Sequence, residues 1–163
     1  MQYRPLGNTG LEVSALSFGA SSLGGVFHDI DEAEGIRTVH AAIDAGINLI
    51  DVSPYYGLTK AETMLGKALR SMPRDRYIVA TKVGRYGEDD FDFSAARVTA
   101  SVDESLARLG IDHIDIIQCH DIEFGSLTQV VEETLPALRR LQGQGKVRYV
   151  GVTGLPLGVF TYV

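Results

Sequence analysis

Short apolar runs alternate with longer amphipathic segments from Ala15 to the end of the sequence. The runs predict strands at Ala15–Phe18, Ile47–Ile50, Tyr77–Thr81, Ile114–Gln118 and Val147–Val152. The amphipathic segments predict helices at Asp31–Ala45, Ala61–Leu69, Ala95–Leu109 and Leu127–Leu141. Strands that alternate with helices in this way are typical of an α/β protein with a parallel sheet.

Local signals mark several of these boundaries. Ser94 is a good N-cap for the helix that follows it, and Gly110 is placed to end that helix. Pro136 lies inside the last predicted helix, which we expect to kink there. Ahead of the first strand, Met1–Leu6 and Leu11–Ser14 flank a glycine-rich turn and predict a small β-hairpin outside the main sheet.

Two folds fit this order of elements, a doubly wound sheet and an eight-stranded (β/α)8 TIM barrel. The loop after the first strand, Gly19–Gly25, lacks the G-x-G-x-x-G pattern of dinucleotide-binding doubly wound sheets, and no phosphate-binding G-x-x-x-x-G-K-[ST] motif is present. We therefore favour the barrel, in which the sequence supplies the first five βα units after a hairpin.

A complete barrel has about 250 residues, so we interpret residues 1–163 as a single, incomplete barrel domain at the N-terminal part of a longer protein. Because five strands leave two sheet edges open, we expect the 163 residues alone to be marginally stable or to associate.

Composition narrows the set of partners. The net charge of -6 and a pI near 5.1 offer no basic surface for nucleic acid. No apolar stretch approaches the roughly 20 residues of a membrane helix. The start of the chain does not resemble a secretion signal, and Cys119 is the only cysteine, so we expect a cytoplasmic protein. The histidines show no metal-ligand spacing, and we assign no metal.

The residues that end successive strands carry the candidate chemistry. Asp51, Lys82, His120 and Thr153 follow the second to fifth apolar runs at intervals of about one βα unit. In a barrel these strand ends ring one mouth, so the side chains are expected to converge. A polar residue at a strand end often marks only the point where the chain reaches water. Three successive complementary groups favour a site instead, because an Asp and a Lys are costly to bury unless they compensate each other.

Tyr56 lies five positions after Asp51, in the loop at the predicted mouth. A free tyrosine, with a pKa of about 10, is a poor acid or base near neutrality, but a nearby ammonium favours the phenolate. Lys82 can supply that ammonium, Asp51 can hold Lys82 charged, and His120 can bind an oxygen on which charge develops. The set is suited to moving a proton on a carbonyl or alcohol oxygen.

Three strand-end motifs resemble those of the aldo-keto reductases. They are Asp51-Val52-Ser53-Pro54-Tyr55-Tyr56-Gly57, Ala80-Thr81-Lys82 and Gln118-Cys119-His120, and the opening Tyr3–Leu11 resembles the family's N-terminal hairpin. The resemblance implies an eight-stranded barrel and hydride transfer with NAD or NADP bound across its mouth. It implies Tyr56 as the proton donor or acceptor, Asp51 and Lys82 as its tuning pair, and His120 as the residue that orients the carbonyl. Gly19, Ala20, Asp51, Tyr56 and Thr153 are the expected cofactor-binding residues.

Segments around Cys119–Leu127 and Gly151–Leu157 are most similar to sugar dehydrogenases of this family. That likeness implies oxidation of the anomeric carbon of a sugar, such as L-galactose, to a lactone, and it favours NAD. Many family members have Ser-Asn after the fifth strand, where they contact the nicotinamide carboxamide. This chain has Thr153-Gly154, and only Thr153 is a plausible replacement.

Two other functions remain open at this point. Lys82 could form a Schiff base with a carbonyl substrate, although Asp51 would raise the lysine pKa whereas imine formation benefits from a lowered one. Alternatively, the chain could be truncated or bind a nicotinamide cofactor without catalysis, as a partner of other proteins. The substrate expected for the enzyme is a small sugar or aldehyde.

Overall fold

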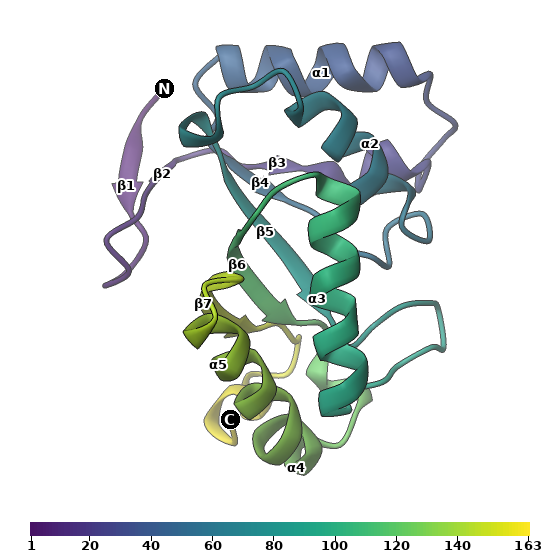
Figure 1. Cartoon of the computed structure of the whole chain (residues 1–163), viewed down its shortest axis with the longest axis vertical. Coiled ribbons are helices and arrows are strands. Elements are labelled where there is room, and N and C mark those ends of the chain that lie inside the picture. The colour runs from purple at the N-terminus through teal and green to yellow at the C-terminus, as the bar shows by residue number, and fades with distance from the viewer.

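The computed structural model describes residues 1–163 as a parallel α/β sheet with a separate N-terminal hairpin (Figure 1). The strands are β1 Tyr3–Pro5, β2 Glu12–Ser14, β3 Phe18–Gly19, β4 Leu49–Asp51, β5 Ile78–Val83, β6 Ile114–Cys119 and β7 Val147–Val152. The α-helices are α1 Glu32–Asp44, α2 Lys60–Leu69, α3 Ala95–Leu109, α4 Leu127–Gln129 and α5 Leu135–Gly143. The short helical turns are η1 Ala20–Gly24, η2 Arg74–Arg76, η3 Ile122–Phe124, η4 Val130–Thr134 and η5 Leu157–Thr161.

The order of the strands distinguishes the two predicted folds. All five strands are parallel and pair in the order β3-β4-β5-β6-β7, which is their order along the chain. A doubly wound sheet reverses its order at a switch point, and this sheet does not. Right-handed crossovers between sequential strands place every helix on the same face, and α1, α2, α3 and α5 pack one against the next (Figure 1). The sheet is therefore part of a TIM barrel wall, as predicted.

The apolar core lies between the sheet and its helices, in two clusters. One joins α1 and α2 to β4 and β5, and the other joins α3 and α5 to β6 and β7. The predicted α3 is confirmed to the residue, since the Ser94 hydroxyl accepts from the Arg97 N–H and Gly110 ends the helix with φ +67°. The predicted β7 is also confirmed.

The first strand lies further along the chain than predicted. Ala15 donates its N–H to the Gln2 carbonyl, and the Ser14 hydroxyl donates to the Leu16 carbonyl, so this part of the apolar run is tied to the hairpin. Pairing with β4 begins only at Phe18, which faces Ile50.

Pro136 does not produce the simple kink that the sequence predicts. The helix widens into a π-turn at Val130–Thr134, where the Leu135 N–H reaches back to the Val130 carbonyl, and α5 then restarts with Pro136 in its first turn. In the first turn of a helix a proline removes no hydrogen bond that the helix needs.

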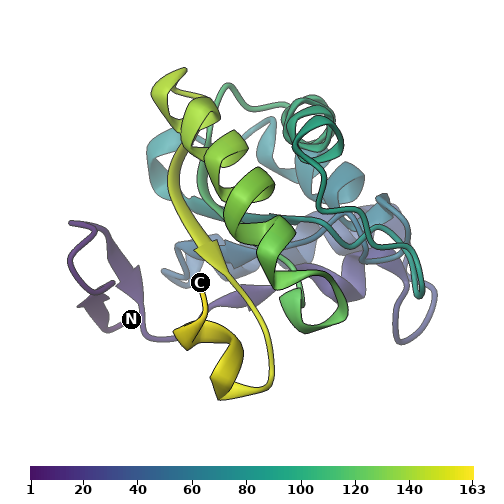
Figure 2. The ribbon, with the colours of Figure 1, turned by 90° about the horizontal axis from the view of Figure 1, so that it is seen from below.

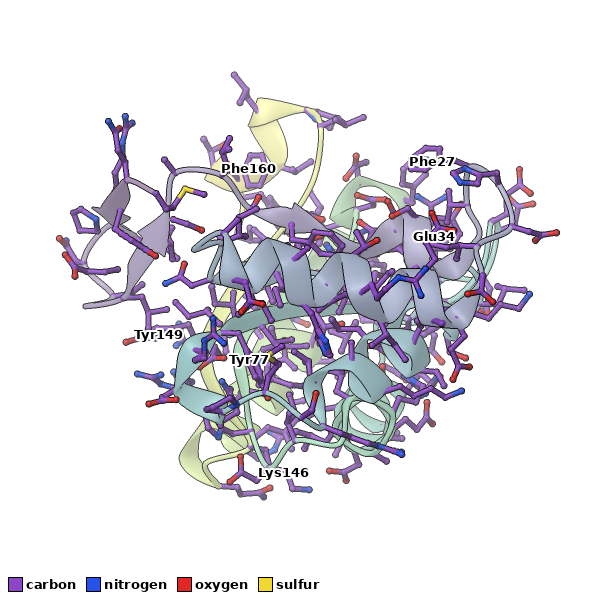
Figure 3. All side chains as sticks on the ribbon, turned by 90° about the horizontal axis from the view of Figure 1, so that it is seen from above. Phe27, Glu34, Tyr77, Lys146, Tyr149 and Phe160 are labelled. Atoms are coloured by element: carbon purple, nitrogen blue, oxygen red, sulfur yellow. The ribbon has the colours of Figure 1, made fainter.

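The hairpin of β1 and β2 is outside the main sheet, as predicted, and lies at its amino end. The Asn48 side chain binds the backbone of Ser14 and Glu12, and the Tyr149 hydroxyl donates to the Thr9 carbonyl. Figure 2 shows the hairpin set to one side of the sheet, away from the helices. In Figure 3 Tyr149 lies toward this end and Phe27 lies at the opposite one, where the candidate site is found. No helix in the chain is both long and apolar enough to cross a membrane.

Candidate active site

The side chains of Asp51 and Lys82 meet at the carboxyl end of the sheet. Thr81 binds Glu62 of α2 and therefore faces the helices, so alternation along β5 turns Lys82 to the opposite, inner face. There the Lys82 Nζ lies 2.6 Å from Asp51 Oδ1 and donates to the Val52 carbonyl at 3.0 Å. The Lys82 side chain is only 6% exposed. The predicted pair is thus formed, and two of the three ammonium protons are engaged.

Tyr56 is held over this pair by the loop between β4 and α2. The Lys82 Nζ lies 4.9 Å from the centroid of the Tyr56 ring. The loop fits closely on η1, because a Cβ added to Gly57 would lie 2.0 Å from the Gly24 carbonyl oxygen, and Gly57 has φ +61°. A glycine at this position therefore permits both the turn and the close contact that fix Tyr56.

His120 completes the group. Its backbone N–H donates to the Val83 carbonyl, which extends the β5–β6 pairing by one residue. Its ring lies 5.8 Å from that of Tyr56, edge-on. All four residues that the sequence predicted as catalytic are thus brought together at one mouth.

The His120 imidazole is buried and neutral at pH 7. Its pKa is lowered from 6.5 to about 4, mainly by burial; the negative charge of Asp121 opposes this shift, and the positive charges of Lys82 and Arg85 add to it. The ring Nδ1 is 3.1 Å from the Ser53 hydroxyl, which also accepts the Tyr55 N–H. A neutral imidazole carries one ring proton, so it can donate a single hydrogen bond to a bound oxygen atom.

Three residues of the site were not predicted from sequence. Ser53 is fully buried against His120, while Arg85 and Asp121 form an ion pair with Nη1 and Oδ2 2.7 Å apart. Each lies within three positions of a predicted site residue. That proximity was a usable signal, because residues next to a strand end share the mouth with it.

The predicted cofactor residues lie at the same end of the sheet. Gly19 pairs with Asp51, and a Cβ added to Gly19 would meet no atom within 4 Å, so the surface above β3 is open to a ligand. Ala20 is buried at the start of η1. The Thr153 hydroxyl accepts the Asp121 N–H at 2.9 Å. A Cβ added to Gly154 would lie 2.8 Å from Glu123 Oε2 and 3.0 Å from Val159 Cγ2.

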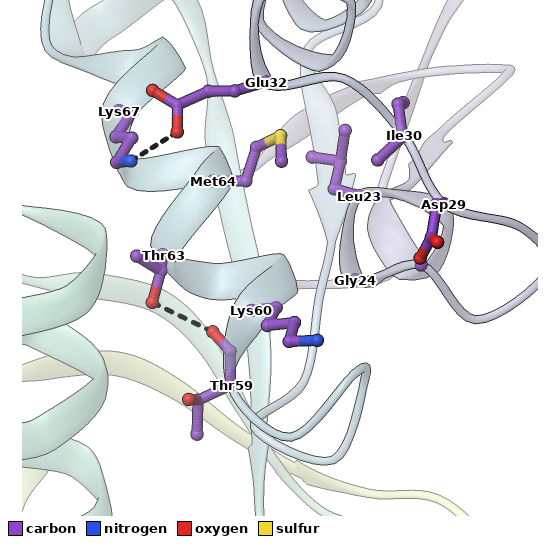
Figure 4. A pocket seen from close by; sticks show the side chains of 11 residues that line it. Leu23, Gly24, Asp29, Ile30, Glu32, Thr59, Lys60, Thr63, Met64 and Lys67 are labelled. Atoms are coloured by element: carbon purple, nitrogen blue, oxygen red, sulfur yellow. Dashed lines mark hydrogen bonds and ion pairs between the residues drawn. The ribbon is translucent and has the colours of Figure 1, made fainter.

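A hollow of about 560 Å³ opens beside Tyr56. Its lining combines residues from η1, the loop after it, the β4–α2 loop and the β5–α3 loop: Ser21, Val26, Phe27, Tyr55, Tyr56, Gly57, Leu58 and Glu88. A second hollow, of about 310 Å³, lies between the starts of α1 and α2 (Figure 4). It contains none of the four predicted catalytic residues, and its Lys67 is paired with Glu32. The hollow beside Tyr56 is therefore the candidate substrate site.

Comparisons with known proteins show what the chain is similar to. The profile of the Aldo/keto reductase family matches residues 15–163. L-galactose dehydrogenase of Arabidopsis thaliana is 59% identical over 100% of the chain and 51% of the relative. An aldo-keto reductase of Bacillus halodurans in its holo form superposes with a TM-score of 0.86 and 34% identity, over 99% of this chain and 53% of the other. An aldo-keto reductase of Klebsiella pneumoniae in complex with NADPH superposes with a TM-score of 0.79 and 27% identity, over 93% and 49% of the two chains. The chain thus spans about half the length of the proteins it matches.

Proposed function

Because the chain belongs to the aldo/keto reductase family, we propose that it is the site-bearing part of an oxidoreductase that oxidises a sugar, such as L-galactose, at its anomeric carbon. The proposed cofactor is NAD or NADP, with NAD favoured by the likeness to L-galactose dehydrogenase. A nicotinamide bound at this site would supply the acceptor for the hydride of C1, and with loss of the proton of the C1 hydroxyl the sugar would become a lactone.

The convergence of Tyr56, Lys82 and Asp51 carries the proposal. Tyr56 takes the proton of the C1 hydroxyl. The Lys82 ammonium, 4.9 Å from the phenol ring, stabilises the phenolate that does so. Asp51 holds the ammonium in place through the 2.6 Å ion pair. A base positioned and tuned in this way contributes roughly 10²–10⁴-fold to a rate.

His120 orients the oxygen from which the proton leaves. The Ser53 hydroxyl has a proton to give to Nδ1, since its oxygen already accepts the Tyr55 N–H. The Asp121 carboxylate, 3.6 Å from Nε2, favours the ring proton on that nitrogen. Nε2–H is then the donor that holds the substrate oxygen, and it stabilises charge there as the oxygen becomes a carbonyl.

The open surface beside Gly19 and Ala20, together with Asp51, Tyr56 and Thr153, fits a nicotinamide ring placed next to Tyr56. The hollow lined by Phe27 and Leu58 fits a pyranose, whose apolar face can pack on such side chains. The substrate on this proposal is a small sugar or aldehyde.

The Schiff-base alternative loses support from the contacts of Lys82. Its Nζ donates to a carboxylate and to a carbonyl, so the nitrogen that would have to attack a carbonyl carbon is already engaged.

The test is NAD(P) reduction by L-galactose, followed at 340 nm, with the product of the complete coding frame. We expect Tyr56→Phe to lose turnover by about 10²-fold or more while it still binds the nicotinamide cofactor, measured by fluorescence titration. Tyr3→Phe is the matched control, since Tyr3 loses only one exposed hydrogen bond, to Gly46, at the hairpin end. Cofactor binding without turnover of any sugar or aldehyde by the unmodified protein would instead support the non-catalytic binding protein.

A further inference from the structure

Arg85 lies beside His120 and has no part in the steps above, and Asp121 enters them only through its charge near His120 Nε2. The Asp121 carboxylate oxygen Oδ2 lies between two partners, with Arg85 Nη1 at 2.7 Å and His120 Nε2 at 3.6 Å. The nearer partner satisfies hydrogen-bond geometry, and the farther one does not. The carboxylate is thus bound to the guanidinium rather than to the imidazole.

The guanidinium of Arg85 is fixed by its surroundings. Its central carbon lies 4.0 Å from the centroid of the Tyr55 ring, 5.1 Å from that of Phe91 and 5.7 Å from that of Phe124. The Phe91 and Phe124 rings stack on each other at 5.3 Å. The Arg85 side chain is only 17% exposed. Three aromatic faces attract the cation and limit its movement.

Asp121 is fixed as well. Its backbone N–H donates to the Thr153 hydroxyl, and its φ of +51° is in the left-handed region. An L-residue adopts that conformation at a cost, which the surrounding contacts must offset. In this conformation the Asp121 carboxylate lies against the Arg85 guanidinium.

We propose that Arg85 is a positioning residue that holds the Asp121 carboxylate away from His120 and so keeps His120 neutral in the working enzyme. The inference rests on the proposed function, because it concerns how the oxygen-orienting residue is prepared.

The charges around His120 explain why such a clamp matters. Lys82 faces the ring from β5 and is balanced by Asp51 from β4. Tyr55, Tyr56 and Ser53 face it from the β4–α2 loop and are uncharged hydrogen-bonding groups. Asp51 is thus paired with Lys82, and the charge of Asp121 is balanced by Arg85 alone. A carboxylate this close to an imidazole favours the imidazolium form unless a stronger cation binds it first.

The test follows the ionisation of His120 by NMR in the complete protein, from the imidazole 13C and 15N signals assigned with a His120→Gln variant. We expect the unmodified protein to show a midpoint near the low pKa of about 4. In Arg85→Met, which keeps an apolar stem on the aromatic rings, we expect the midpoint to rise by about one pH unit or more. Arg85→Lys, which retains a cation, should show a smaller rise. A midpoint in Arg85→Met that matches the unmodified protein would overturn the proposal.

A second variant keeps the test decisive if Arg85→Met does not fold. Asp121→Asn retains the shape of the side chain and removes its charge, so the His120 midpoint should fall or stay where it is, and it should no longer respond to Arg85→Lys. A midpoint that rises in Asp121→Asn would contradict the clamp. Because the NMR signal does not depend on turnover, an inactive protein with the expected midpoints would refute the proposed function and leave this inference standing.

Discussion

The buried, neutral state of His120 makes a quantitative prediction for stability in acid. Burial lowers the pKa of His120 from 6.5 to about 4. Between these two pH values the unfolded chain binds a proton on this ring and the folded chain does not. Acidification therefore favours the unfolded state, and the free energy of unfolding falls as the pH drops from about 6.5 to about 4.

The size of the effect follows from the same two values. Each pKa unit corresponds to 1.36 kcal/mol of free energy, so the whole interval corresponds to about 3 kcal/mol. The His120 side chain is 6% exposed, and solvent screening of the ring is correspondingly small. A loss of this size is a substantial part of the 5–15 kcal/mol that is typical of folded proteins.

The assay compares urea unfolding of the unmodified protein and of His120→Gln at four pH values between 7.5 and 4.5. All other titrating groups, including His28, His40 and His113, are shared by the two proteins, so the difference between their unfolding free energies isolates His120. From pH 7.5 to pH 4.5 we expect the unmodified protein to lose about 2 to 3 kcal/mol more of its unfolding free energy than His120→Gln loses. If the unfolding free energies of the two proteins change in parallel with pH, the reasoning is refuted.

Four further predictions concern other parts of the molecule. Burial raises the pKa of Cys119 to about 12, so its thiol should resist Ellman's reagent at pH 8 until the protein is unfolded; rapid reaction of the folded protein would be inconsistent with this. Glu62→Ala removes the buried carboxylate that accepts hydrogen bonds from Thr81, Ser105 and Arg108 and should cost about 3–5 kcal/mol in urea unfolding; Glu62→Gln should cost less. Gly66→Ala should destabilise the protein despite the better helix propensity of alanine, because the new Cβ would lie 2.1 Å from the Arg108 carbonyl oxygen; an unchanged melting temperature would argue against that contact. Lys82→Met removes the cation beside the phenol and should lower the turnover of sugar oxidation by about 10²-fold or more; unchanged turnover would remove Lys82 from the proposed mechanism.

The sequence predicted best those elements whose boundaries are coded locally. The helix Ala95–Leu109 has a capping serine before it and a glycine after it, and both act within a few residues. The first strand was misplaced because its apolar run is divided by contacts with the hairpin. The π-turn before Pro136 was missed because widening of one helical turn leaves no mark in the hydrophobic period.

In the candidate site, too, residues marked by local sequence signals were predicted, and residues placed by distant contacts were not. Asp51, Lys82 and His120 were predictable because each ends a strand, and parallel strands bring their ends to one mouth. Their convergence with Tyr56 is observed, while their catalytic roles stay predictions. Ser53 and Arg85 act through contacts with residues 67 and 36 positions away, which spacing along the chain does not specify.

The hydrogen bond from the Tyr149 hydroxyl to the Thr9 carbonyl has a consequence for the order of folding. It joins positions 140 residues apart, whereas Asn48 meets Ser14 across only 34. At a synthesis rate of about 5–20 residues per second, the hairpin leaves the ribosome on the order of ten seconds before Tyr149. The Asn48 contact with the hairpin can therefore form early in synthesis, whereas the Tyr149 hydrogen bond can form only late. A contact that forms after the rate-limiting step slows unfolding and leaves the folding rate almost unchanged, so Tyr149→Phe should shorten the lifetime of the folded state.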